Sequence, residues 1–348
     1  MPTDRGQEVR SSFFQKARRS DITRNVRQTI VAIGALGAGA LLAGDALAQA
    51  YPVKPIRLIV ANAPGGGADL VARLLSEKLA RPLGRQIIVE NRPGGSGLIG
   101  ADLVAKAAPD GYTLLLGTTL TLISSPALHP NLPYKSPADF APISLLASTT
   151  YVLVVHPSVP ARTVKDLALL AKARPGGMSY ASGGTGTVGH IASELFASSV
   201  GARLVNVTYR GSGPGVFSVV LGETDLMFCN LLPAVPFLKM SRVRALGIAS
   251  LKRSTILPDV PTLHESGLPG FDVQQYYSLV APAATSGEIV SRLNQEIARH
   301  FQSPDVKSRL AGDGSEVQVS TPAELEKLIV SEIAKWARAI RQAGIRPE

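Results

Sequence analysis

Cysteine is almost absent from this sequence, because only Cys229 among its 348 residues carries a thiol. A single thiol can form no disulfide within the chain and no cysteine-based metal site. The five histidines do not share the spacing of metal ligands. Cys229 itself lies in an apolar run, where a buried and inert thiol is the usual state. We therefore predict neither a metal nor another cofactor.

Sequence signatures of catalysis and of nucleotide binding are also missing. Ser96 and Ser212 lie among glycines, but neither fits the Gly-x-Ser-x-Gly pattern of hydrolase nucleophiles. Two matches to the dinucleotide-binding pattern, at 95–100 and 184–189, lack the acidic residue that should follow about 20 positions later. We therefore predict that the protein is not an enzyme. A secreted hydrolase or transferase is the alternative, and it would need an activated nucleophile beside a base.

Acidic residues are outnumbered by basic ones, and the net charge of the sequence is +10. Residues 1–48 contain seven Lys/Arg and four Asp/Glu, which leaves a net charge of +7 for the rest of the chain. An excess of positive charge suits an anionic ligand or simple solubility. Nucleic-acid binding would also need a recognisable reading motif, and the sequence contains none. We predict no nucleic-acid partner.

The N-terminal segment resembles a secretion signal. A basic stretch precedes the apolar run 29–44, which is too short and too rich in glycine for a comfortable membrane span. The small residues around Ala48 match the preference of a signal peptidase. We predict that residues 1–48 are a signal peptide, removed on export to the periplasm by cleavage after Ala48 or Ala50. A retained membrane anchor is the alternative.

The most informative stretch of the mature chain begins with a strand. Residues 56–60 form a short, apolar, β-branched run that is typical of a buried parallel strand. Pro64 and the glycines at 65–67 then break the chain, and apolar residues at helical spacing follow. Asp69 stands in the first helical turn, where we expect it to cap N–H groups rather than to contact a ligand. This arrangement gathers free N–H groups around one space, as in an anion site. The alternative is a tight turn that uses glycine only for backbone freedom.

Strands and helices alternate along the rest of the chain, which indicates an α/β protein with parallel sheets. We predict further strands at 87–90, 113–116, 178–181, 206–209, 225–229 and 244–249, and helices at 98–108, 161–173, 191–199, 288–301 and 322–343. The apolar run 143–155 is longer than one buried strand needs, so we expect it to cross between two lobes, with 274–281 as the return. Residues 51–150 and 278–348 would then form the first lobe and 151–277 the second.

Loops rich in glycine and hydroxyl groups follow strands of both lobes, at the edge where open parallel sheets bind their ligands. The loop 182–189 leads into a helix as the first glycine turn does. We favour His190 as a residue that holds this loop by hydrogen bonding over one that contacts a ligand. Other loops bring Thr118, Thr119, Tyr209, Gly211 and Asn230 to the same edge. A ligand between the lobes would meet helix N-termini from both sides.

Several longer phrases of the sequence resemble one protein family. They are Pro-Gly-Gly-Gly-Ala-Asp (64–69), Val-Glu-Asn-Arg-Pro-Gly-Gly-Ser-Gly (89–97), Pro-Asp-Gly-Tyr-Thr-Leu (109–114), Gly-Thr-Val-Gly-His-Ile (186–191), Tyr-Arg-Gly-Ser-Gly-Pro (209–214), Leu-Pro-Asp-Val-Pro-Thr (257–262) and Glu-Ser-Gly-Leu-Pro-Gly (265–270). In this order they resemble the Bug family, the extracytoplasmic substrate-binding proteins of tripartite tricarboxylate transporters. The resemblance implies a type II periplasmic-binding-protein fold, in which two α/β lobes are joined by two crossover strands with a ligand cleft between them. It also implies a small carboxylate as ligand and a two-component membrane permease as partner, and we expect a monomer.

The family's binding loops, together with the polar strand ends described above, give the candidate ligand-binding residues. They are Ala63, Pro64, Gly65, Gly66, Gly67, Asp69, Thr118, Thr119, Ser182, Gly183, Thr185, Gly186, Thr187, His190, Tyr209, Gly211 and Asn230. Three departures from the family concern the hinge and the cleft wall. Cys229 stands where an acidic residue is usual, which disfavours an amine-bearing ligand, while 276–278 and 284–286 replace Trp-Tyr-Gly and Gly-Thr-Pro. The alternative function is that of a periplasmic sensor that contacts a signalling protein.

Overall fold

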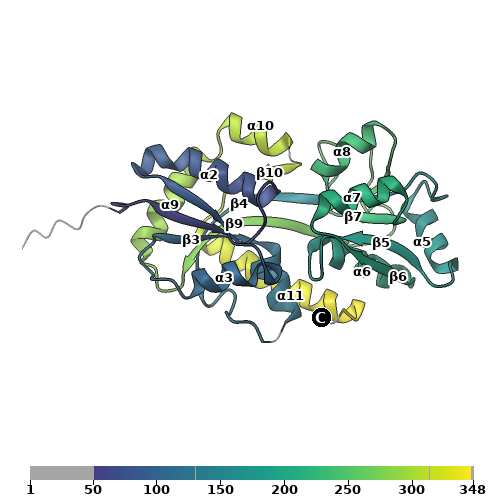
Figure 1. The fold of residues 1–348 in the computed structure, drawn as a ribbon, viewed down its shortest axis with the longest axis horizontal. Coiled ribbons are helices and arrows are strands. Elements are labelled where there is room, and N and C mark those ends of the chain that lie inside the picture. The colour runs from purple at the N-terminus through teal and green to yellow at the C-terminus, as the bar shows by residue number, and fades with distance from the viewer. Residues whose placement is uncertain (1–50, 130, 313, 346–348) are drawn as a thin grey trace, which may run out of the picture. The chain divides into compact units, whose positions relative to one another are not determined.

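The computed structural model describes residues 51–129, 131–312 and 314–345 (Figure 1). The predicted signal peptide, 1–48, lies outside the described residues. From Lys54 onward the chain forms one structural unit. In this unit two sheets share the long strand β4 (Phe140–Val155), and each sheet with its helices makes one lobe.

The sheet of the first lobe contains the strand predicted at 56–60. Its strands, in spatial order, are β2 (Ile87–Asn91), β1 (Ile56–Val60), β3 (Thr113–Thr118), β9 (Gln274–Pro282) and the first part of β4, with β10 (Ser315–Val317) also beside β4. Its helices are α2 (Gly67–Leu83), α3 (Leu98–Ala105), α9 (Gly287–His300) and α10 (Pro304–Gly312). β1 is parallel to both of its neighbours. Its residues Ile56, Leu58 and Ile59 are fully buried, as expected for a parallel strand covered on both faces.

The sheet of the second lobe has the same parallel centre. Its strands are β8 (Arg244–Ile248), the second part of β4, β7 (Leu226–Asn230), β5 (Met178–Ser182) and β6 (Leu204–Thr208). Its helices are α5 (Val164–Ala173), α6 (Val188–Val200), α7 (Ser212–Leu221) and α8 (Leu231–Lys239). β5 is parallel to both β6 and β7, so the loops after these strands open at one edge of the sheet.

β4 crosses from one sheet to the other near Thr150. It pairs with β9 up to Thr150, and from Tyr151 onward it pairs with β7 and β8. The return crossing lies at the start of β9, where the N–H of Val273 donates to the carbonyl of Ala249 in the second lobe (2.9 Å) and Gln274 pairs with Thr150. The two apolar runs that we predicted as crossing segments are therefore the crossing strands.

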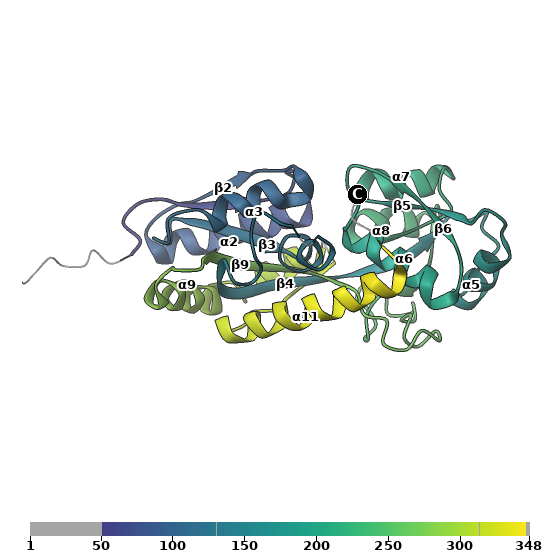
Figure 2. The same ribbon diagram turned by 90° about the horizontal axis from the view of Figure 1, so that it is seen from below.

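The C-terminal helix α11 (Pro322–Ala343) also contacts both lobes. Figure 2 shows it running along β4 towards α6. At its end, the Ser198 hydroxyl of α6 donates to the carbonyl of Gln342 (3.2 Å). The described lobes are thus linked by α11 as well as by β4 and β9.

Two helices with glycine or leucine residues before a proline in the first turn were not predicted. α7 begins with Ser-Gly-Pro and α8 with Leu-Leu-Pro, and neither helix was predicted. Proline is tolerated in a first turn because the N–H that it lacks would have no acceptor within the helix. α6 begins at Val188 rather than at 191, so His190 lies inside the helix. α10, β10, the π-helical turn η2 (Leu120–Ser124) and the short helix α4 (Ser125–Leu128) were not predicted either.

Candidate functional site

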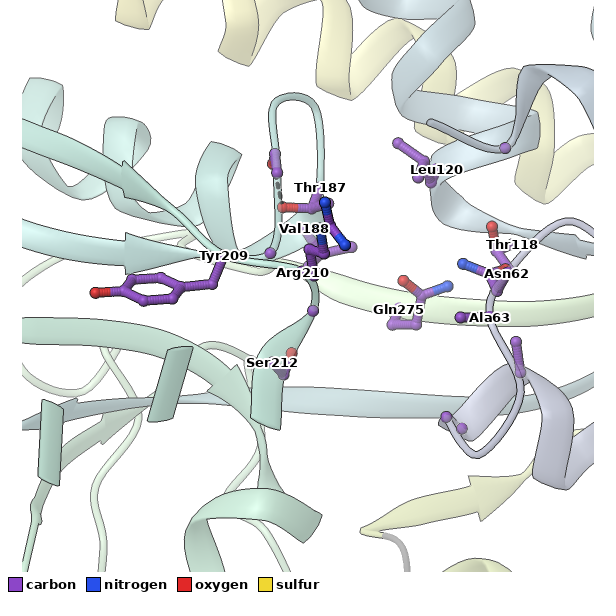
Figure 3. A pocket seen from close by; sticks show the side chains of 18 of the residues that line it. Asn62, Ala63, Thr118, Leu120, Thr187, Val188, Tyr209, Arg210, Ser212 and Gln275 are labelled. Atoms are coloured by element: carbon purple, nitrogen blue, oxygen red, sulfur yellow. Dashed lines mark hydrogen bonds between the residues drawn. The ribbon is translucent and has the colours of Figure 1, made fainter. Parts of the chain in front are cut away.

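A cavity of about 870 Å³ lies between the two lobes (Figure 3). We call it the cleft cavity. Its first-lobe wall comes from the loops after β1, β2 and β3 and from β9, and its second-lobe wall from the loops after β5 and β6 and from β7. Small-molecule sites typically have volumes of about 300–1,000 Å³. The cavity therefore has the size for a ligand and lies at the strand edge that the sequence indicated.

The first-lobe wall contains the N-terminus of α2, which no side chain caps. The N-cap is Gly66, and Gly66, Gly67 and Ala68 all line the cavity. The N–H groups of a first turn have no acceptor within the helix, and they carry the positive end of the helix dipole. The glycine turn thus presents N–H groups to the cavity, as an anion site requires.

Asp69, in the same turn, does not line the cavity but holds the loop before it. Its carboxylate accepts hydrogen bonds from the N–H of Gly65 (3.1 Å), from Nε of Arg73 (2.9 Å) and from Nδ2 of Asn91 (3.1 Å). Burial opposes ionisation of this carboxyl, but the hydrogen bonds from Arg73, Gly65 and Asn91 outweigh it and hold the pKa of Asp69 below its ordinary value of 3.8. Asn91 also donates to the carbonyl of Asn62 (3.1 Å). Asp69 therefore caps the N–H of Gly65, just outside the helix.

The second-lobe wall contains the N-terminus of α6, which is also uncapped. Its N-cap, Thr187, is a residue type that usually caps helices. Here the Thr187 hydroxyl instead donates to the carbonyl of Gly184 (2.6 Å). Thr187, Val188 and Gly189 line the cavity, so the first-turn N–H groups of α6 border it as those of α2 do.

Gly189 allows α6 to approach the sheet closely. A Cβ at this position would lie 2.5 Å from the carbonyl oxygen of Phe228 in β7, which is closer than atoms can pack. Any larger residue would therefore push the start of α6 away from β7. Because Phe228 also lines the cavity, the close packing of helix and strand fixes this part of its wall.

His190 holds the loop that leads into α6. Its Nδ1 accepts a hydrogen bond from the N–H of Gly186 (3.2 Å), and its ring stacks on Tyr180. The carbonyl of Gly186 accepts a hydrogen bond from the Ser124 hydroxyl of η2 in the first lobe (2.9 Å). The loop is therefore attached both to its own helix and to the opposite lobe, and this is the loop-holding role that the sequence favoured for His190.

The N-terminus of α7 completes the second-lobe wall. Gly211 is its N-cap, no side chain caps it, and Tyr209, Arg210, Gly211 and Ser212 line the cavity. The Tyr209 ring points away from the cavity in Figure 3. Its hydroxyl donates a hydrogen bond to Glu223 (3.4 Å). Among the described residues that line the cavity, only Arg210 carries a full charge. Within the described chain its guanidinium has no ion-pair or hydrogen-bond partner, so it is available to a ligand.

Polar side chains of the first lobe face this positive wall. In Figure 3, Asn62 and Thr118 lie on the first-lobe side of the cavity, and Thr187 and Arg210 lie on the second-lobe side. Gln275 of β9 also lines the cavity, and its Nε2 donates to the carbonyl of Tyr276 (2.9 Å). The cavity therefore offers amide and hydroxyl groups besides helix N-termini and one cation.

About half of the residues predicted from the sequence line the cavity. These are Ala63, Gly66, Gly67, Thr118, Gly183, Thr187, Tyr209 and Gly211. The others lie outside the lining: Pro64, Gly65, Asp69, Thr119, Ser182, Thr185, Gly186, His190 and Asn230. Several of these hold the loops together. Thr119, for example, accepts a hydrogen bond from the N–H of Tyr276 (2.7 Å) and so ties the loop after β3 to β9.

Several residues of the lining were not among the candidates predicted from the sequence. They include Asn62, Gly94, Gly184, Val188, Gly189, Arg210, Ser212, Gln275 and Tyr277. Arg210 could have been found, because it lies two residues after the end of β6 and directly before Gly211, the N-cap of α7. Gln275 carried no such signal, since its position depends on the crossing of β9 between the lobes.

The described residues contain no group of His, Cys, Asp and Glu that could hold a metal ion. Cys229 is fully buried, and burial raises the pKa of its thiol, as expected for an inert side chain. Over the same part of the chain, none of the helices has the length and apolar character needed to cross a membrane.

A family model described as tripartite tricarboxylate transporter family receptor matches residues 71–345. The chain belongs to this receptor family. The protein BugT of Bordetella pertussis is 35% identical to it over 323 residues, which cover 92% of this chain and 99% of BugT. This relationship confirms the resemblance to the Bug family.

Solved structures of similar proteins have the same fold. The structure of R. palustris Rpa4515 with adipate is 32% identical, has a TM-score of 0.79, and the match covers 86% of this chain and 100% of that one. MatC (Rpa3494) from Rhodopseudomonas palustris with bound malate is 34% identical, with a TM-score of 0.76 and coverage of 83% and 100%. The predicted fold class, that of periplasmic binding proteins, is therefore confirmed.

Proposed function

We propose that this receptor binds a small organic carboxylate in the cleft cavity and delivers it, unchanged, to the permease of a tripartite tricarboxylate transporter. One observation carries the proposal. Uncapped N-termini of α2, α6 and α7 meet an unpaired arginine in a cavity whose described lining contains no Asp or Glu. Such a lining stabilises an anion by hydrogen bonds and by charge, and it offers nothing comparable to a cation.

The lining suits a ligand with two carboxylates. The similar structures named above hold adipate and malate, and each of these molecules has two carboxylate groups. In this chain, the first-turn N–H groups would bind one carboxylate, directly or through bridging water. Arg210 would pair with the other, because its guanidinium can hold both oxygens of a carboxylate at once.

We further propose that the lobes close on this ligand. Contacts from both walls form together only when the lobes approach, so binding would favour the closed arrangement. The lobes would be 51–150 with 274–348 and 151–273, rather than with the boundary after 277 expected from the sequence, because β9 pairs with the first part of β4 from Gln274 onward. The crossings near Thr150 and Val273 would be the hinge. The family is one of transport receptors, and we assign the protein no catalytic step.

The cellular setting belongs to the same proposal. Residues 1–48 would direct export and be removed, and the mature protein would act as a monomer in the periplasm. Its partner would be a two-component membrane permease, the remainder of the tripartite tricarboxylate transporter that the family description names.

A thermal-shift screen of the purified protein tests the proposal. Mono-, di- and tricarboxylates of increasing chain length are compared with phosphate and with cationic amines. A ligand at about a hundred times its dissociation constant should stabilise the native state by about 2.7 kcal/mol, so a true ligand gives a clear, saturable rise in Tm. We expect the largest rise with a dicarboxylate. If no carboxylate raises Tm above the phosphate control, the proposed function is wrong.

A further inference from the structure

A second cavity, of about 470 Å³, lies where α6, α11 and the segment 267–273 meet. It shares no lining residue with the cleft cavity. Its volume also falls within the usual range for small-molecule sites, about 300–1,000 Å³. We propose that it is a second binding site, for a small molecule with an apolar body and one carboxylate. This proposal does not depend on the function proposed for the cleft cavity.

The body of such a ligand would lie on apolar walls. These walls come from Leu195 of α6, from Leu268 and Phe271 of the segment 267–273, and from Trp336 of α11. Trp336 is 2% exposed, and its indole N–H donates to Oε2 of Glu332 (3.0 Å). Because this hydrogen bond fixes the ring and satisfies its only polar group, the indole offers a rigid apolar surface.

The charges at the second cavity favour a single carboxylate. Lys335 is already paired, with Asp272 (3.3 Å) and with Glu332 (2.9 Å). Arg338, one turn of the helix further on, has no ion-pair or hydrogen-bond partner within the described residues. Asp272 also lines the cavity, and the two cations and two carboxylates of this group balance. Arg338 is nevertheless the one cation of the described lining without a partner, and a carboxylate is the group that best matches a guanidinium.

The second cavity lies directly behind the wall of the first. The Phe271 ring stacks on that of Phe228, with 5.9 Å between ring centroids, and Phe228 lines the cleft cavity. α6 contributes Val188 to the cleft cavity and Leu195 to the second one. A molecule in the second cavity would thus contact a helix and a ring stack that also form the cleft wall, while α11 joins it to the first lobe.

The single tryptophan of the sequence provides a local readout, because Trp336 lines the second cavity. The purified full chain is titrated with cyclohexanecarboxylate, an apolar ring with one carboxylate, and tryptophan fluorescence is recorded. We expect a saturable change. Cyclohexylmethanol, which keeps the ring but lacks the charge, should bind roughly tenfold more weakly, because a hydrogen bond to a charged group is lost. Equal binding of the two probes, or no saturable change, would overturn the proposal.

Two variants of α11 locate the bound probe. Arg338→Gln should weaken binding of cyclohexanecarboxylate by roughly tenfold, because it removes the charge that holds the carboxylate. Arg341→Gln removes the same charge from the same helix outside the cavity lining and should bind like the wild type. Both side chains are exposed, so neither change should prevent folding. If Arg338→Gln binds as tightly as the wild type, or if the response is lost in Arg210→Gln instead, the second site does not exist.

Discussion

Helices α2, α6 and α7 begin at the cleft cavity, whereas α5, α9 and α11 begin away from it. The two groups differ in whether a side chain caps the N–H groups of the first turn. Thr163, Ser286 and Thr321 cap the second group, each accepting a hydrogen bond from a first-turn N–H. In the first group no side chain does so. α3 belongs with the first group, since its N-cap Gly97 lines the cavity and no side chain caps it. α4 and α8 fit neither group, since their N-caps, Ser124 and Asn230, make no capping bond and do not line the cavity.

This contrast indicates that the helix starts at the cavity lack the stabilisation that a side-chain cap would give. A cap contributes about 1 kcal/mol to stability, and α5, α9 and α11, which begin away from the cavity, each have one. At the cavity the chain places glycine, or in α6 a threonine whose hydroxyl is turned to Gly184. The first-turn N–H groups then keep their capacity for an external acceptor, which in our account is the ligand carboxylate.

The largest effect is expected when a side-chain cap is added to a helix that begins at the cavity. Gly66 has an extended backbone, and a Cβ there would meet nothing within 4 Å. Gly66→Asp should therefore fold and cap α2, but its carboxylate would stand where the ligand carboxylate binds. We expect affinity for the best dicarboxylate to fall at least about a hundredfold, because like charges repel, while Tm stays the same or rises. Calorimetric titration and thermal unfolding measure the two effects.

Gly66→Asn is the matched control for this variant. It has nearly the same shape and can cap the helix, but it carries no charge. Its loss of affinity should be about tenfold at most. Equal affinity of Gly66→Asp and the wild type would show that the N-terminus of α2 takes no part in binding.

Removing Asp69 should affect stability more than binding. Asp69→Ala leaves the N–H of Gly65 without its acceptor and removes one of the two acceptors of the Asn91 amide, so the free energy of unfolding should fall by about 2 kcal/mol. Affinity should fall by less than it does in Gly66→Asp. Denaturant unfolding and calorimetry compare the two variants. A large loss of affinity at unchanged stability would instead make Asp69 a ligand contact.

The same substitution has a pH dependence whose sign is fixed by the lowered pKa. Below pH 3.8 the unfolded chain binds a proton at this residue more readily than the native protein does. The stabilisation by Asp69 is therefore complete well above pH 3.8 and is lost as the pH falls through the lower native pKa. The difference in unfolding free energy between wild type and Asp69→Ala should shrink in that acidic range. A difference that is constant with pH would contradict the ion pair and hydrogen bonds described for Asp69.

Neutralising the cleft arginine should weaken binding with little effect on stability. Arg210→Gln removes the one full charge of the described lining, and its side chain has no partner in the described chain to lose. We expect about a tenfold loss of affinity for dicarboxylates and a smaller loss for monocarboxylates. Arg203→Gln, in the same lobe but outside the lining, is the control. Should both variants bind equally well, Arg210 does not select the ligand.

The smallest effect is expected at a helix that begins away from the cavity. Thr163→Ala removes the side chain that accepts from the N–H of Asp166 at the start of α5 (3.1 Å). Stability should fall by about 1 kcal/mol, and ligand affinity should not change. Thermal unfolding measures the loss of stability of this variant, and calorimetric titration measures its ligand affinity. A loss of affinity here would mean that helix starts away from the cavity also contribute to binding.

Much of the fold could be predicted because local sequence patterns indicate its strands. The run 56–60 and the C-terminal helix were found with the bounds that the structure gives, since apolar spacing and turn residues define both. α7 and α8 were missed because glycine and proline in their first turns look like loop residues. The contact of α11 with both lobes could not be foreseen, because it depends on tertiary packing rather than on any local pattern.

The site was predictable at the level of loops but not of side chains. Glycine turns identified the loops before α2 and α6, since only a few residue types allow such close backbone approaches. Whether a given loop residue lines the cavity or holds the loop depends on the direction in which its side chain points. The sequence pattern does not specify that direction. Asp69 and His190 hold loops by hydrogen bonds. Arg210 and Gln275 line the cavity although they were not predicted to do so.

The most direct test of the central claim compares one dicarboxylate with its uncharged twin. The dicarboxylate that gives the largest thermal shift and the corresponding diamide are each titrated calorimetrically into the wild-type protein. Our account predicts saturable binding of one dicarboxylate per chain and at least hundredfold weaker binding of the diamide, because the uncapped helix ends and Arg210 recognise negative charge. Equal affinity for the two molecules would contradict it.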